Sequence, residues 1–80
     1  MEIKILGSGC ARCQRLEELT REAVTDLGLK ADIVHVRDMQ AIMAYPILAT
    51  PGLVINEKVV SSGRLPAKSQ IISWLTSAAE

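Results

Sequence analysis

The chain has 80 residues, enough for one domain with a modest core, and its nine basic and nine acidic side chains give a formal net charge of zero. The neutral charge and the presence of only two aromatic residues, Tyr45 and Trp74, argue against nucleic acid as a partner, because binding it favours a basic face or stacking aromatics. The uncharged segment of residues 41–55 is too short to span a membrane, and the apolar run at the start is too short for a secretory signal. We therefore expect a single cytoplasmic domain over residues 1–80, with no nucleic-acid or membrane partner.

The first part of the sequence predicts a strand, a long helix and a second strand. Residues 2–6 place Ile3 between charged neighbours and lead into a glycine, which indicates a strand followed by a loop. From residue 13 to residue 27 apolar residues recur every three or four positions, which predicts an amphipathic helix that starts at Cys10 and ends at Gly28. Residues 30–36 carry apolar side chains on both faces, which predicts a strand in the interior of a sheet.

The remaining sequence predicts a short helix, a hairpin and a final helix. Asp38 is placed to cap a helix over residues 39–45, which a proline terminates. Residues 52–55 and 59–61 flank a short polar turn and predict a β-hairpin. Apolar positions three or four apart predict a last helix over residues 67–79.

These elements follow the order βαβαββα. The first strand, the long helix and the second strand form a right-handed parallel crossover, and the hairpin extends the sheet with antiparallel strands. The expected fold is a three-layer α/β domain with a four-stranded mixed sheet and three helices. The loop after the first strand then lies at the carboxyl end of that strand, where open α/β sheets place their sites.

That loop carries the only two cysteines, Cys10 and Cys13, three residues apart. A disulfide closing so short a loop stabilises a fold by only about 2 kcal/mol, so a structural role explains the pair poorly. Cys13 lies on the apolar stripe of the helix, whereas Cys10 lies at the helix start, where backbone N–H groups and the helix dipole lower the pKa of a thiol. We expect Cys10 to attack a disulfide and Cys13 to resolve the mixed disulfide. Arg12 adds positive charge nearby and is weighed equally as a site residue and as part of a solvated helix face.

The same pair could instead bind a soft metal. Two thiolates can hold Cu(I) or supply half of a tetrahedral zinc site. The chain offers few further ligands, because His35 lies mid-strand, where a hydrogen-bonded core histidine is commoner than a ligand, and Met39 and Met43 are expected to fill the core. We expect no metal and no other cofactor, and keep a Cu(I) or zinc binding module as the alternative. A dimer sharing a metal has no positive support in the sequence, and we expect a monomer.

With the residues "IKILGSGCARC", the segment "ATPGLVINEKVVSSGRLP" and the closing helix, the chain resembles the thioredoxin superfamily. It is most similar to the small archaeal and bacterial thioredoxin-like or glutaredoxin-like redox-active disulfide proteins. The resemblance implies a thiol-disulfide oxidoreductase that acts on a disulfide-containing protein or a small thiol and receives electrons from a reductase. It also implies a cis bond between Thr50 and Pro51 facing the cysteines, backbone pairing of Thr50 with the substrate, and Gly63 as a wall of the thiol groove. With Arg12, these are the expected substrate-binding residues.

The sequence also departs from typical thioredoxins. Gly9 stands where they have a tryptophan, and the dipeptide between the cysteines is Ala-Arg in place of Gly-Pro. The first strand offers only Glu2 and Lys4, so no equivalent of thioredoxin's buried acid is evident behind the cysteines. Reduction potential and partners are therefore not implied. Heavy-metal-associated domains also carry CxxC after their first strand, but their order is βαββαβ and Ser8 replaces their usual methionine.

Overall fold

The computed structural model describes residues 1–79. Its elements are β1 (Glu2–Leu6), α1 (Ala11–Leu27), β2 (Asp32–Val36), α2 (Met39–Met43), β3 (Gly52–Ile55), β4 (Lys58–Ser62) and α3 (Lys68–Ala79). The predicted order βαβαββα is confirmed, and each boundary lies within two residues of its predicted position. Within residues 1–79, no helix has the length and hydrophobicity needed to cross a membrane.

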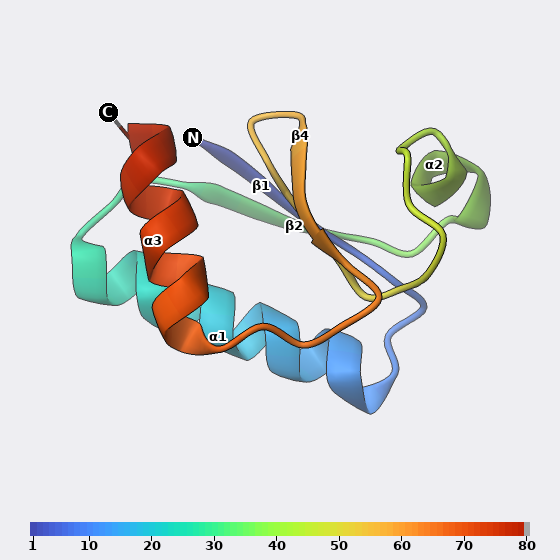
Figure 1. Ribbon diagram of the computed structural model, residues 1–80, viewed down its shortest axis with the longest axis horizontal. Coiled ribbons are helices and arrows are strands. Elements are labelled where there is room, and N and C mark those ends of the chain that lie inside the picture. Colours follow the sequence, from blue (N-terminus) through green and yellow to red (C-terminus); the bar gives the residue numbers. More distant parts are fainter. Residues whose placement is uncertain (80) are drawn as a thin grey trace.

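The four strands form one mixed sheet in the order β2-β1-β3-β4. β1 and β2 are parallel, whereas β3 is antiparallel to both β1 and β4. Figure 1 shows α1 and α3 close together and α2 set apart from them. Because α1 and α3 pack on one face of the sheet and α2 packs on the other, the predicted three-layer architecture is confirmed.

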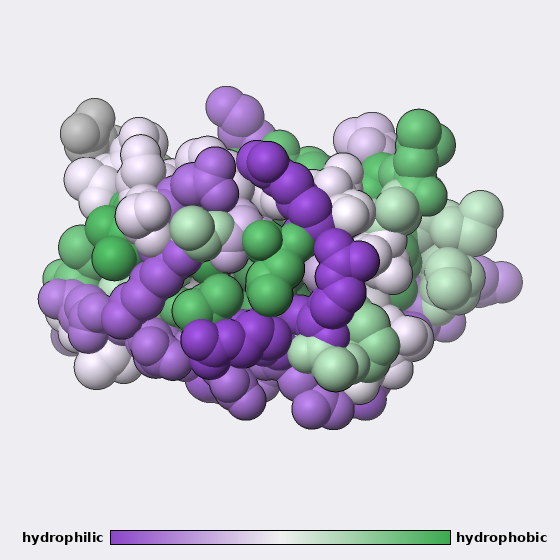
Figure 2. Space-filling model, turned by 60° about the horizontal axis from the view of Figure 1, so that its bottom comes forward, coloured by the Kyte–Doolittle hydropathy of each residue, from purple (hydrophilic) through white to green (hydrophobic). Residues whose placement is uncertain are grey.

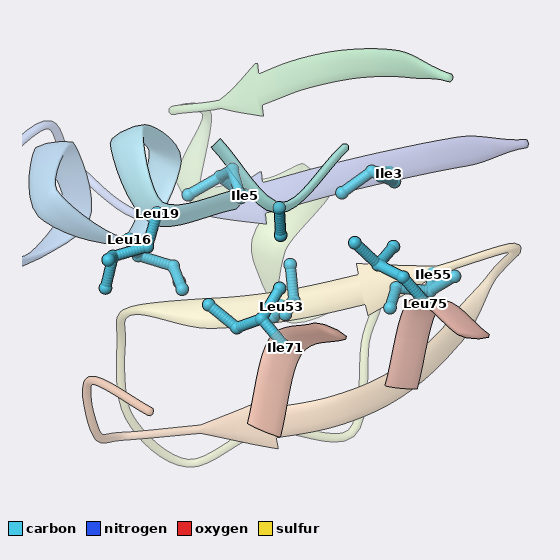
Figure 3. Packing of buried hydrophobic residues seen from close by; sticks show 9 residues of the cluster. Ile3, Ile5, Leu16, Leu19, Leu53, Ile55, Ile71 and Leu75 are labelled. Atoms are coloured by element: carbon cyan, nitrogen blue, oxygen red, sulfur yellow. The ribbon is translucent and has the colours of Figure 1, made fainter. Parts of the chain in front are cut away.

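The main core lies between the sheet and the pair α1 and α3. Alternate residues of β1 and β3 face the apolar stripes of the two helices, as the strand and helix periods require. The fully or nearly buried members are Ile3, Ile5, Leu16, Leu19, Ala23, Leu53, Ile55, Ile71 and Leu75. Figure 3 shows that side chains from the sheet and from both helices are directed into one common space. A smaller cluster of Leu6, Ile42 and Val54 fills the opposite face under α2.

Local sequence signals set the ends of several elements. Gly28 adopts a left-handed conformation with φ of 64° and ends α1, as predicted. The Asp38 carboxylate accepts a hydrogen bond of 3.2 Å from the backbone N–H of Ala41 and so caps α2. Asn56 and Glu57 both have positive φ, 50° and 67°, which matches the two-residue turn that joins twisted antiparallel strands.

Strand β2 lies at an edge of the sheet, so the prediction of an interior strand is wrong. Its apolar residues occur on both faces because the strand flanks both cores: Ile33 packs on the main cluster and Val36 on the smaller one. Between them, Val34 remains 48% exposed. A strand can therefore carry apolar residues on two faces without having a strand on each side.

Helix α2 also differs from its prediction. It ends at Met43, two residues early, since a residue that precedes a proline disfavours the helical conformation. Met39 and Met43 are 57% and 73% exposed, so the expectation that they fill the core is wrong. Only Ile42 of this helix is buried. Figure 2 shows hydrophobic residues at the surface at the end of the molecule where α2 lies.

The difference in burial between two valines predicts a difference in stability. Val54 in β3 is 1% exposed, and Val34 in β2 is 48% exposed. We expect Val54→Ala to lower the free energy of unfolding by about 2 kcal/mol, because it removes buried methyl groups and leaves a cavity. Val34→Ala, the matched control, should cost less than about 1 kcal/mol. Urea denaturation of both variants measures the difference, and equal losses would contradict the assignment of Val54 to the second core.

Candidate functional site

Cys10 and Cys13 lie at the amino end of α1, in very different surroundings. Cys10 is the N-cap residue, with extended backbone dihedrals of φ −68° and ψ 171°, and its side chain is exposed. Cys13 is in the first turn and is fully buried. Their Sγ atoms are 3.2 Å apart and both thiols are free. One thiol is therefore open to a partner while the other lies close behind it.

The backbone of Gly7 lies directly against the sulfur of Cys13. A β-carbon at Gly7 would overlap Cys13 Sγ, so only glycine fits between the end of β1 and the buried thiol. The same β-carbon would lie 3.9 Å from Cβ of Thr50. The Gly7 N–H donates a hydrogen bond of 3.0 Å to the carbonyl of Val36, which holds this backbone in place. The end of β1 and the segment before β3 thus meet at Cys13.

These surroundings shift the two thiol pKa values in opposite directions. The hydrogen bond from Cys13, followed by backbone N–H groups of the first turn, lowers the pKa of the Cys10 thiol. Burial, followed by the hydrogen bond and the charge of Cys10, raises the pKa of the Cys13 thiol. The pair therefore favours a thiolate at Cys10 and a neutral thiol at Cys13.

His35 in β2 holds the loop between β1 and α1 in place, and its side chain is only 11% exposed. Its Nδ1 lies 2.9 Å from Oε1 of Glu17, and its Nε2 lies 3.2 Å from the carbonyl oxygen of Gly7. The prediction of a hydrogen-bonded core histidine is confirmed. These two contacts join His35 in β2 to α1 and to the end of β1. Partial burial raises the pKa of the Glu17 carboxyl, but hydrogen bonds from His35 and Arg21 outweigh this effect and lower the pKa. The Glu17 carboxylate therefore stays charged.

The segment before β3 closes the site from the other side. The Thr50–Pro51 peptide bond is cis, as the resemblance implied. The N–H of Gly63 donates a hydrogen bond of 2.9 Å to the carbonyl of Pro51, and Gly63 has φ of 74°, a conformation that suits glycine. Nη2 of Arg12 lies 3.4 Å from the carbonyl oxygen of Gly63. The structure thus gathers Cys10, Cys13, Arg12, Thr50, Pro51 and Gly63 in one place.

Several residues at this site were not found from the sequence. The sequence indicates Gly7 only as the start of a flexible loop and gives Glu17 and Arg37 no role. In the structure Gly7 contacts Cys13, Glu17 orients His35, and the Arg37 guanidinium lies against Gly9. Glu17 is one helical turn after Cys13, and that spacing was an available signal. The contact of Arg37 with Gly9 joins the ends of two strands, and no local pattern indicates it.

Residues 1–76 match the family described as "Thioredoxin domain". This chain belongs to the thioredoxin family. It is 39% identical over 71 residues to a protein named thioredoxin from Methanothermobacter thermautotrophicus, a match that covers 89% of this chain and 92% of the relative. It is 35% identical over 75 residues to a protein named thioredoxin from Methanocaldococcus jannaschii, covering 94% of this chain and 86% of that relative. The predicted membership and fold are confirmed.

The alternative of a metal-binding module receives less support from this architecture. The fourth element of this fold is the helix α2, whereas the fourth element of the βαββαβ order of heavy-metal-associated domains is a strand. Among residues 1–79, no three His, Cys, Asp or Glu side chains gather in a way that could hold a metal ion. Binding of a soft metal by the two thiols of this thioredoxin-family protein stays the alternative to the expected redox function.

The origin of the lowered Cys10 pKa can be tested at Cys13. Because the largest cause is the hydrogen bond from Cys13, Cys13→Ala should raise the Cys10 pKa toward the ordinary thiol value of about 8.5. Cys13→Ser keeps a donor and should raise it less. The rate of Cys10 alkylation against pH measures both values, with unfolding curves as the control for stability. Equal pKa values in the two variants would contradict this cause.

Proposed function

We propose that this protein is a thiol-disulfide oxidoreductase in which Cys10 attacks and Cys13 resolves. The observation that carries the proposal is the pair of unlike thiols 3.2 Å apart, one exposed and one buried. The opposite shifts of their pKa values suit these two roles. Membership of the thioredoxin family supports the same chemistry.

In the first step the Cys10 thiolate attacks one sulfur of the substrate disulfide. A bond forms between Cys10 Sγ and that sulfur, the substrate S–S bond breaks, and the second substrate sulfur leaves as a thiolate that takes a proton from water. The number of disulfide bonds is unchanged, because Cys10 has replaced the leaving sulfur as the partner of the first substrate sulfur.

In the second step Cys13 gives its proton to water and its thiolate attacks Cys10 Sγ. The mixed disulfide breaks, a disulfide forms between Cys10 and Cys13, and the first substrate sulfur leaves as a thiolate. Two electrons have then passed from the protein to the substrate. The first step prepares the second, because the Cys10 charge and hydrogen bond that raise the Cys13 pKa are lost once Cys10 enters the mixed disulfide.

The surroundings of Cys10 supply the proposed substrate site. Backbone groups of Thr50 pair with the substrate chain, Pro51 and Gly63 form the walls of the groove, and Arg12 borders it. The substrate is a disulfide-containing protein or a small thiol compound, and a reductase returns the oxidised pair to the dithiol. We place this activity in the cytoplasm and in a monomer, without a cofactor.

The two serine variants test the assignment and act as controls for each other. Cys10→Ser should reduce disulfide reduction to the uncatalysed rate, because the exposed nucleophile is gone. Cys13→Ser should still attack but should accumulate the mixed disulfide, which mass spectrometry detects as an adduct on Cys10 that dithiothreitol removes. Parent activity in Cys10→Ser would overturn the proposal. Tight one-to-one Cu(I) binding by a reduced protein that reduces no disulfide would favour the metal-binding alternative.

A further inference from the structure

The charged side chains are unevenly paired across the molecule. Of the nine lysines and arginines, four form ion pairs with carboxylates within residues 1–79. The five that form none there are Arg12, Lys30, Arg37, Lys58 and Arg64. This division follows the ends of the sheet. Leu6, Val36, Gly52 and Ser62 lie side by side in the register and define what we call the cysteine end of the sheet.

All three of the unpaired arginines lie at the cysteine end. Arg12 is in the first turn of α1, Arg37 directly follows β2, and Arg64 follows Gly63 beyond the end of β4. The two lysines without an ion pair lie at the opposite end of the sheet. Lys58 is opposite Ile55 in the register of β3 and β4, and Lys30 precedes the start of β2. The molecule is therefore neutral as a whole but carries unpaired positive charge around its thiols.

Two of these guanidinium groups are placed on either side of Cys10. Arg37 comes from the β2 edge of the sheet and lies against Gly9, the residue before Cys10. Arg12 reaches toward the β4 edge, where Nη2 lies 3.4 Å from the Gly63 carbonyl oxygen. Arg12, Arg37 and Arg64 are all exposed to solvent. Asp38 is the acidic residue nearest in sequence to Arg37, and its carboxylate caps α2.

These arginines have no evident task within the chain. The lowered pKa of Cys10 is due to hydrogen bonds from Cys13 and backbone N–H groups, so their charge is not needed for it. The single contact of Arg12 with Gly63 uses one donor at a long distance, and a guanidinium has five. Planar guanidinium groups match the geometry of carboxylates, which they bind through paired hydrogen bonds. Exposed charges of one sign around a site also increase the rate of encounter with an oppositely charged partner.

We propose that Arg12, Arg37 and Arg64 form a recognition rim for carboxylates, and that the preferred substrate is a peptide disulfide flanked by acidic residues. This inference rests on the proposed oxidoreductase function and adds the class of substrate. Attraction to the rim brings the acidic segment to Cys10, and the chemistry then follows the two exchange steps given above, with the same balance of electrons and protons.

Three cyclic peptides of equal length test the rim, each with one disulfide flanked by glutamate, glutamine or lysine. The pre-reduced protein is mixed with each peptide in a single turnover, and free thiols are trapped by alkylation and counted by mass. At low salt the glutamate peptide should react about ten-fold faster than the glutamine peptide, and the lysine peptide should react slowest. The preference should be present at about 0.01 M salt and absent at about 1 M salt, because the Debye length falls from about 30 to about 3 Å over this range.

Substitution of single charged residues by glutamine tests which of them cause the preference for the glutamate peptide. Arg12→Gln and Arg37→Gln should each lower the ratio of glutamate-peptide to glutamine-peptide rates by about two- to five-fold, and the triple arginine variant should bring it close to one. Lys30→Gln and Lys58→Gln remove unpaired cations at the opposite end and should leave the ratio unchanged. The ratio is measured within each variant, so that a change in thiol reactivity alone does not alter it.

The neutral reagent 2-hydroxyethyl disulfide separates the two proposals. If the protein reduces it but reduces the glutamate and lysine peptides at equal rates, the recognition rim is overturned and the oxidoreductase stands. An equal loss of ratio in the lysine variants would likewise overturn the rim. If none of the disulfides is reduced, the proposed function itself fails and the substrate class falls with it.

Discussion

The contact between Gly7 and the sulfur of Cys13 fixes the site to the sheet. It joins the last residue before the cysteine loop to the first turn of α1, so the end of β1 packs directly against the start of the helix. The hydrogen bond from Gly7 to Val36 and the bond between His35 and the Gly7 carbonyl extend the connection to β2. A buried sulfur with close-packed neighbours has little freedom to move, because protein interiors are as dense as organic crystals. The position of Cys10 follows from that of Cys13, because Cys10 is the N-cap residue three positions before it.

While Cys13 is held within the first turn of α1, Cys10 lies just before the helix begins. Cys10 is outside the helix in its dihedral angles, yet the backbone N–H groups of the first turn face its sulfur. The same few residues thus provide an exposed sulfur with stabilised charge and a buried sulfur for which charge is costly. Across 3.2 Å the surroundings thus change from solvent to protein interior, which in the proposed reaction lets a substrate reach Cys10 and not Cys13. Neither the spacing of the cysteines nor the helix dipole would produce it without the contact behind Cys13.

Most of the fold could be predicted because its signals are local. The apolar stripe placed Cys13 inside and Cys10 at the helix start, and Gly28 and Asp38 marked helix ends through conformations and hydrogen bonds within a few residues. The errors and omissions concern contacts between segments far apart in the chain. The two bonds of His35 join residues 18 and 28 positions away. Whether an apolar strand is central or at an edge likewise depends on neighbours that its own residues do not specify, and β2 was misplaced for that reason.

The distribution of charge over the molecule also depends on contacts between distant segments, which local sequence signals do not predict. A formal net charge of zero correctly describes the chain but says nothing of where the charges lie. Helical spacing lets Arg15 and Arg21 find carboxylates three or four residues away on α1, as local rules predict. Arg12 and Arg37 lie at the same end of the sheet only because a parallel crossover returns the chain, so that β1 and β2 end side by side. The topology that brings a cysteine loop to the carboxyl end of a strand therefore also brings unpaired arginines there, and a site with its own electrostatic character arises in a protein without net charge.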